Sequence, residues 1–364
     1  MTLVPPSVHR TADLRWDLPP LVRLFGTRPV LVTDTGIAGT GLAEAVAACI
    51  DARVVTVPSG EPQGETVAAL ARELSTADVV VALGGGSVLD TAKLAGRLVR
   101  EPDGLADRLL AANPFPVGLP VVALPTTSGS GAEVTRTAVV THNGRKTWAW
   151  EESLRPELAV LAPELCAGVP PAVVRAAGLD AFVHAVEAAT GARRTPELSS
   201  AGFLAAHAIV QSLAESLEGD SAARGRMMEA ATAAGVAIDH GGTGIGHAVG
   251  HALGSICAIP HGLAVMLGLL AGLEWTLRQA PQPFAGLAEI LGVEVDELPE
   301  RLEAFAAQVG FDDAIGTYMP PVLSDLAAEM LAEDHLPMRR NAARPITEDD
   351  VGEVAELVIA RWSA

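Results

Sequence analysis

A long uncharged segment constrains the fold of this chain more than any other feature. Residues 240–273 contain no Asp, Glu, Lys or Arg, yet they hold four of the nine histidines in the chain. An imidazole in an apolar segment has to find a partner, because burying it unpaired costs free energy. Clustered imidazoles most often share a metal ion. The segment therefore predicts a buried metal-binding region.

The spacing of these histidines favours helices. His247 and His251 are four residues apart and so share one helix face, and His261 follows a proline at a new helical start. Upstream, Asp180 and His184 are again four residues apart. Two such pairs on two helices suffice to hold one divalent ion, although spacing alone does not choose between His247 and His251.

A membrane span is the alternative for an uncharged segment, and it needs about 20 apolar residues. Nine glycines, a proline and the histidines interrupt residues 240–273, and the longest clean stretch, 262–273, is too short. We therefore expect no membrane span here.

Length, charge and cysteine usage narrow the class of protein. A chain of 364 residues suggests two domains. A net charge of −19 argues against nucleic acid as a partner, because phosphate binding needs clustered Lys and Arg. The three cysteines show no paired spacing and the N-terminal stretch has no apolar core of signal-peptide type. We expect a soluble, cytoplasmic protein.

Strands and helices alternate only in the first half of the chain. After residues 168–171, strand-like runs stop and Ala-rich helical patterns continue. The alternation predicts a doubly wound parallel sheet. We predict an α/β domain over 1–166 and an all-helical domain over 167–364. The predicted strands are 29–34, 54–57, 79–83 and 121–124, and the helices between them are 42–49, 67–74 and 88–99.

Two loops rich in glycine and hydroxyls follow predicted strands, GGGSVLDTAK at 84–93 and PTTSGSGAEVT at 125–135. The first loop alone is explained about as well by a tight turn. Together, at the carboxyl ends of parallel strands, they predict a dinucleotide site. Asp34 ends its strand where it could bind the ribose hydroxyls and repel a 2′-phosphate; a capping role is the alternative.

Four motifs in this order resemble the iron-containing (group III) alcohol dehydrogenases: GGGSVLDTAK, LPTTSGSGAEVT, GLDAFVHAVEAATG and GIGHAVGHALGSICAIPHG. The similarity spans nearly the whole chain, and the late NAARPITEDDV resembles the closing motif of that family. The resemblance implies an N-terminal dinucleotide-binding α/β domain, a helical C-terminal domain and a metal in the cleft between them, as in the dehydroquinate synthase-like two-domain fold.

Position by position, the resemblance implies specific site residues. Asp180, His184, His247 and His261 become the metal ligands, and His251 becomes a proton-relay residue. Asp90 and Lys93 could orient the first loop, and Asp90 is counted with the cofactor site. The remaining implied cofactor contacts are Asp34, Gly85, Gly86, Ser87, Thr126, Thr127, Thr135 and Lys146.

The implied activity is reversible hydride transfer between NAD(H) and a small aldehyde or ketone, with the metal as Lewis acid. The resemblance favours iron, whereas the ligand types suit Fe(II) and Zn(II) equally. NADP(H) is disfavoured by Asp34, and a homodimer or larger homo-oligomer is expected. A maleylacetate reductase is a close alternative, although such enzymes often lack the acidic ligand. A dehydroquinate synthase-type sugar-phosphate cyclase usually has Glu in place of Asp180 and needs more basic residues.

Departures from the family pattern bear on the substrate. Ala342 stands where Pro is usual, and Trp148 and Trp150 are atypical. Three arginines lie near the motifs: Arg136, Arg193 and Arg194. They could bind an aldehyde that carries a carboxylate or phosphonate, with the tryptophans forming a wall of the pocket. The alternative is that these arginines are solvated surface residues.

Overall fold

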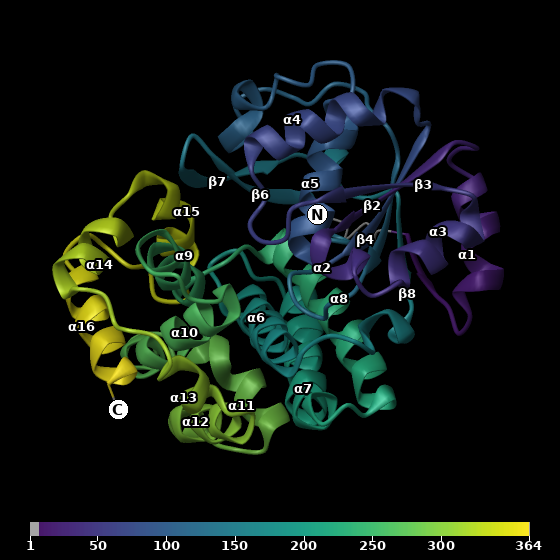
Figure 1. Cartoon of the computed structure of the whole chain (residues 1–364). Helices are drawn as coiled ribbons and strands as arrows, with labels where there is room; N and C mark the ends of the chain where they lie inside the picture. Colours follow the sequence, from purple (N-terminus) through teal and green to yellow (C-terminus); the bar gives the residue numbers. More distant parts are fainter. Residues whose placement is uncertain (1–6, 364) are drawn as a thin grey trace. The chain divides into compact units, whose positions relative to one another are not determined.

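A computed structural model describes residues 7–363, and the chain divides into two compact units. One unit comprises the residues up to Thr127 together with Gly131–Val169, and the other comprises Ser128–Ser130 and the residues from Pro170 onward. All strands of the described residues belong to the first unit, and the second is built from helices (Figure 1). The predicted fold class is therefore confirmed.

Six strands form the main sheet of the first unit, in the order β1-β8-β5-β4-β2-β3, and every neighbouring pair is parallel. A separate antiparallel hairpin joins β6 to β7. The strands are β1 (Val8–Arg10), β2 (Pro29–Asp34), β3 (Arg53–Val57), β4 (Val79–Gly84), β5 (Val121–Pro125), β6 (Thr137–His142), β7 (Arg145–Trp150) and β8 (Leu158–Leu161).

Helices cover both faces of this sheet because alternate side chains of each strand point to opposite sides. Leu31 of β2 packs in one core with α1 and α3, whereas its neighbours Val30 and Val32 pack in a second core with α4 and α5. The helices of this unit are α1 (Leu14–Arg23), α2 (Thr35–Ala38), α3 (Leu42–Ile50), α4 (Gly64–Glu73) and α5 (Gly86–Arg97).

The four predicted strands all form, but β1, β8 and the β6–β7 hairpin were not predicted. Asn143 and Gly144 join the hairpin strands, and both have positive φ angles, 52° and 75°. An Asn-Gly pair between strands is the strongest short-range signal for such a hairpin. That signal is present in the sequence and would have identified β6 and β7.

The helical unit is organised around α6. Residues 178–190 of this helix are all buried, including the polar side chains of Asp180, His184 and Glu187. The elements are α6 (Pro171–Thr190), α7 (Pro196–Leu217), α8 (Ser221–Gly241), α9 (Ile245–Ile256), α10 (His261–Leu277), α11 (Ala285–Leu291), α12 (Leu298–Gln308), α13 (Phe311–Ile315), α14 (Leu323–Met330), α15 (Leu336–Asn341) and α16 (Val351–Trp362).

The uncharged segment is divided among the end of α8, the whole of α9 and most of α10, with a non-helical stretch at 257–260. Within the described part of the chain, no helix combines the length and the apolar character needed to cross a bilayer. The histidine-rich segment instead forms part of the core of the helical unit.

Close packing between α6 and α10 depends on one glycine. A Cβ at Gly262 would overlap the backbone carbonyl of Ala176. Since backbone atoms of a packed helix cannot move aside cheaply, α10 approaches α6 this closely only because residue 262 has no side chain.

We expect Gly262→Ala to destabilise the helical unit by roughly 1–3 kcal/mol, because the added methyl group forces α10 away from α6. Denaturant unfolding measures this loss. Gly254→Ala is the matched control: a Cβ at Gly254, on α9, would meet no atom within 4 Å. That variant should be neutral or slightly more stable. Equal stability of Gly262→Ala and the wild type would contradict the packing argument.

Candidate metal centre and nucleotide-binding loops

Three helices of the helical unit supply the four predicted metal ligands. Asp180 and His184 lie one turn apart on α6, His247 lies near the start of α9, and His261 is the first residue of α10. The stretch between α9 and α10 turns the chain so that the rings of His247 and His261 come within 5.4 Å, measured between centroids.

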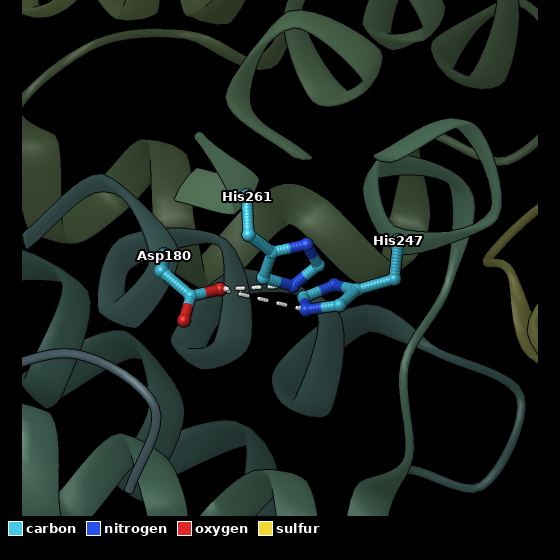
Figure 2. Close-up of side chains that lie close together, drawn as sticks. All are labelled: Asp180, His247 and His261. Carbon is cyan, nitrogen blue, oxygen red and sulfur yellow. Dashed lines mark ion pairs between the residues drawn. The ribbon is translucent and has the colours of Figure 1, made fainter. Parts of the chain in front are cut away.

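Three imidazoles surround a single carboxylate oxygen. The Nε2 atoms of His184, His247 and His261 each lie 3.7 Å from Oδ1 of Asp180. This distance is too long for a hydrogen bond. Two ligands that each lie about 2.1 Å from a tetrahedral ion are about 3.4 Å apart, so the spacing suits atoms that share one cation. Figure 2 shows Asp180, His247 and His261 converging in this way.

The atoms at the centre of this cluster lack other partners. Oδ1 of Asp180 and Nε2 of His247 are buried and have no hydrogen bond among the described residues. One ligand atom from each of Asp180, His247 and His261 lies within 4.8 Å of the others, and the His184 ring stacks on His247 at 4.7 Å. Buried polar atoms are nearly always satisfied, so these atoms fit a bound cation.

Charges within the cluster shift its pKa values. Burial alone would raise the pKa of Asp180, but His184, His261 and His247 together lower it below the usual range. Burial lowers the pKa of His184. For His247 burial acts downward as well, yet the carboxylates of Glu187 and Asp180 outweigh it and raise its pKa to about 9. Without a metal, His247 therefore holds a proton that a metal must displace.

Glu187 is a buried carboxylate that the sequence analysis did not identify. It lies on α6 three residues after His184, and Oε2 accepts a 2.7 Å hydrogen bond from Nδ1 of His247. The signal for it was present: Glu187 is the one charged residue in the apolar stretch that follows Asp180 in GLDAFVHAVEAATG.

His251 lies beside the cluster, not within it. Its ring centroid is 5.2 Å from that of His261 and 6.1 Å from that of His247. On its other side, the ring of His335 lies 6.2 Å away, and Nε2 of His335 is 3.3 Å from Oε1 of Glu329. His335, the N-cap residue of α15, was also missed from sequence, because it comes to this region from a distant part of the chain.

The two loops predicted to bind a nucleotide lie where the strand order of the sheet reverses. From β2 the chain passes to β3 on one side and then returns to β4 on the other. Ligands of doubly wound sheets bind beside the carboxyl ends of the strands at such a switch point. Asp34 ends β2, and the glycine loop follows β4 directly, so both predicted elements lie at this position.

The two predicted loops contact each other. Thr126, after β5, donates its backbone N–H to the Gly84 carbonyl at 3.0 Å, and a Cβ at Gly85 would lie 3.2 Å from Oγ1 of Thr127. Gly85 caps α5, and Gly86 begins that helix with Ser87 in its first turn. Free N–H groups at this helix start are suited to a phosphate.

Asp90 and Lys93, both on α5, bind the backbone of the second loop and of β6. Lys93 is fully buried and donates to Oδ1 of Asp90 and to the Ala132 carbonyl, both at 3.1 Å. Oδ2 of Asp90 accepts from the Val139 N–H at 2.9 Å. Both carboxylate oxygens of Asp90 are thus engaged by the protein, which matches an orienting role better than a direct contact with the cofactor.

Other predicted cofactor residues have partners within the protein. Oδ1 of Asp34 accepts the N–H groups of Gly36 and Ile37, both at 2.9 Å, so the capping alternative does occur. Thr135 is buried in the second loop. Lys146 lies on β7, with Nζ 2.5 Å from Oε1 of Glu61. Ribose contact by Asp34 and cofactor contact by Lys146 stay predictions.

Comparison with known proteins identifies the family. The profile described as iron-containing alcohol dehydrogenase matches residues 5–163, and that of the Fe-containing alcohol dehydrogenase family, C-terminal, matches residues 174–356. The chain belongs to the iron-containing alcohol dehydrogenase family. The resemblance inferred from the four sequence motifs is confirmed.

Individual relatives within this family are similar over most of their length. A sulfoacetaldehyde reductase of Bilophila wadsworthia is 32% identical over 296 residues, covering 78% of this chain and 76% of the relative. An NAD-dependent methanol dehydrogenase of Bacillus methanolicus is 32% identical over 307 residues, covering 80% of each. Among solved structures, an alcohol dehydrogenase from Oenococcus oeni is 26% identical with a TM-score of 0.87, covering 98% of this chain and 99% of that one.

The side chains that depart from the family pattern lie in different surroundings. Arg193 and Arg194 are exposed. The guanidinium of Arg136 lies 4.5 Å from the ring centre of Trp150, and its Nη1 is 3.3 Å from Oε2 of Glu152. Trp148 is half-buried on β7, whereas Trp150 is 39% exposed.

We expect the affinity of this site for a divalent metal to rise with pH up to about 9. Below that pH a metal competes with the proton on His247, so affinity should fall about tenfold per pH unit. Chelator competition at several pH values measures this dependence.

Unfolding of the metal-free protein provides the reciprocal test. The raised pKa of His247 stabilises the fold fully below about pH 6.5, and that contribution is lost as pH rises through about 9. In the chelator competition, a metal affinity that does not change with pH would contradict the placement of His247 as a ligand.

Proposed function

We propose that the protein is a metal-dependent, NAD(H)-linked alcohol dehydrogenase that reversibly reduces a small aldehyde or ketone. The observation that carries this function is the convergence of three imidazole nitrogens on one oxygen of Asp180, in a chain of the iron-containing alcohol dehydrogenase family. The overall reaction converts aldehyde, NADH and one proton into alcohol and NAD⁺.

The proposed metal ligands are Asp180, His184, His247 and His261. One carboxylate and three imidazoles suit Fe(II) or Zn(II), and the family description favours iron. The bound ion would supply Lewis-acid polarisation of the substrate carbonyl. The protein contributes a pre-formed, mostly buried ligand set in which Oδ1 of Asp180 and Nε2 of His247 have no hydrogen bond among the described residues.

The proposed cofactor site consists of the two loops after β4 and β5. The start of α5, at Gly86 and Ser87, would bind the pyrophosphate through its free N–H groups. NAD(H) would supply or accept the hydride, and the protein would orient it. The name of the Bacillus methanolicus relative supports NAD. Asp34 retains Oδ2 for a ribose hydroxyl while Oδ1 caps α2, which favours NADH over NADPH.

His251 is the proposed proton donor to the product alkoxide, directly or through a water. It is partly exposed and lies next to His261, outside the inner cluster. An imidazole in this position can exchange its proton with solvent between turnovers.

We expect His251→Gln to retain the metal but to lower kcat by about 100-fold, with an altered pH profile, because the general acid is removed. Elemental analysis and kcat against pH measure the two effects. His207→Gln on α7 is the control for loss of a histidine and should leave both unchanged. Loss of metal from His251→Gln would make His251 a ligand instead.

The proposed substrate is a small aldehyde with an acidic group such as a phosphonate or carboxylate. The sulfoacetaldehyde reductase among the relatives acts, by its name, on an anionic aldehyde. Arg193 and Arg194 are available at the surface, whereas Arg136 would have to exchange Glu152 for the substrate. Arg339 is a further candidate: it is only 3% exposed, and its Nε has no partner among the described residues.

Two alternative activities are weaker. Maleylacetate reductases often lack the acidic ligand, yet Asp180 is present here and engaged by three imidazoles. A sugar-phosphate cyclase would need clustered basic residues around a phosphate, in a chain whose net charge is −19. Cytoplasmic location stays a prediction, supported by three cysteines that form no disulfide, and homo-oligomeric assembly stays a prediction as well.

A kinetic assay tests the proposed function. We expect metal-reconstituted protein to oxidise NADH only when an aldehyde is added, and to use NADPH less well. A higher kcat/KM for an anionic short-chain aldehyde than for a neutral one of equal length would support a substrate with an acidic group. Equal values would contradict the proposal that the substrate carries such a group. Absence of turnover with every aldehyde and ketone tested would overturn the function.

A further inference from the structure

Glu187 is the second buried carboxylate of α6, with only 3% of the residue exposed. Its oxygens accept four hydrogen bonds, all from the beginning of α9. Oε2 accepts from Gly244 N and from His247 Nδ1, both at 2.7 Å. Oε1 accepts from Gly246 N at 2.5 Å and from His247 N at 3.4 Å. Among the described residues, the start of α9 thus supplies four N–H donors to this carboxylate.

This arrangement selects one form of the His247 ring. A neutral imidazole carries its single proton on either Nδ1 or Nε2, and only the nitrogen without the proton can bind a metal. Because Nδ1 of His247 donates to Glu187, the lone pair must lie on Nε2. That nitrogen faces Oδ1 of Asp180 at 3.7 Å and has no hydrogen bond among the described residues.

The same carboxylate also completes the start of α9. The N-cap of this helix, Gly244, has no side chain to bind the first N–H groups. Glu187 accepts three of them from the neighbouring helix, and a carboxylate at a helix N-terminus is favourable. The backbone of α9 and the ring of His247 are therefore held by one group.

We propose that Glu187 is a positioning residue that holds His247 in the Nδ1–H tautomer and fixes its ring for metal binding through Nε2. Outer carboxylates of this kind orient metal-ligating histidines and raise their basicity. Glu187 acts through His247 and does not touch the metal or the substrate. This role rests on the proposed metal site, but the tautomer itself can be observed in the metal-free protein.

Glu187→Gln is the decisive variant because it keeps the shape of the side chain and reverses one hydrogen bond. A glutamine can accept N–H bonds only through its oxygen, and its NH₂ group donates. If that NH₂ faces Nδ1 of His247, the ring proton moves to Nε2, where it blocks the metal. We expect metal affinity to fall 10- to 100-fold, as for other outer-shell changes.

Two measurements separate positioning from a purely structural role. Long-range ¹H–¹⁵N NMR at about pH 10, above the pKa of about 9 for His247, reports which ring nitrogen carries the proton in the metal-free protein. Chelator competition reports metal affinity per folded molecule. Glu353→Gln is the matched control, since Glu353 on α16 accepts from Trp275 Nε1 at 2.9 Å in the same unit. It should change neither readout.

The outcomes are distinct. An Nδ1–H tautomer in the wild type, together with an Nε2–H tautomer and weakened metal binding in Glu187→Gln, supports the assignment. Unchanged affinity per folded molecule in Glu187→Gln would make Glu187 only a helix cap and overturn it. If that variant does not fold, an Nε2–H tautomer in the wild type would overturn it equally. Failure of the wild type to reduce any aldehyde would remove the proposed function without changing the tautomer result.

Discussion

The carboxylate of Asp180 is the group around which the helical unit is built. Burying a carboxylate in an apolar interior is costly unless opposite charge or hydrogen bonds compensate. Three imidazoles from α6, α9 and α10 surround its Oδ1, and they hold the pKa of Asp180 low despite its burial. Any displacement of one of these helices would leave that compensation incomplete.

The face of α6 that carries Asp180 continues with His184 and Glu187, at intervals of four and three residues. These intervals place all three side chains in one row along the helix. The row contains two buried carboxylates, and the charge of each is compensated in a different way. Asp180 faces imidazole nitrogens and fits a cation, whereas Glu187 is satisfied by four N–H donors of α9. One helix face thus carries two of the proposed ligands and the carboxylate that accepts a hydrogen bond from a third.

Periodicity was enough to predict the parallel sheet and the helical unit, whereas the choice of the four converging residues came from the family resemblance, because spacing alone did not separate His247 from His251. Strands β2, β4 and β5 are apolar runs that end in turn residues, which is why their positions could be predicted closely. The short strands β1, at one edge of the sheet, and β8, between β1 and β5, were missed because runs of three or four residues carry too little periodicity. Glu187 and His335 were missed for another reason: each becomes meaningful only through partners 60 or more residues away, or through a helix packed from the end of the chain.

His247 and His251 show most clearly where sequence periodicity stops being informative. They lie on the same face of α9, and spacing treats them alike. Their partners differ: Nδ1 of His247 donates to Glu187, which directs Nε2 toward Asp180, whereas the ring of His251 lies between those of His261 and His335. Tertiary packing therefore gives two histidines of equivalent spacing different surroundings: His247 is buried between two carboxylates, and His251 is partly exposed beside two other imidazoles.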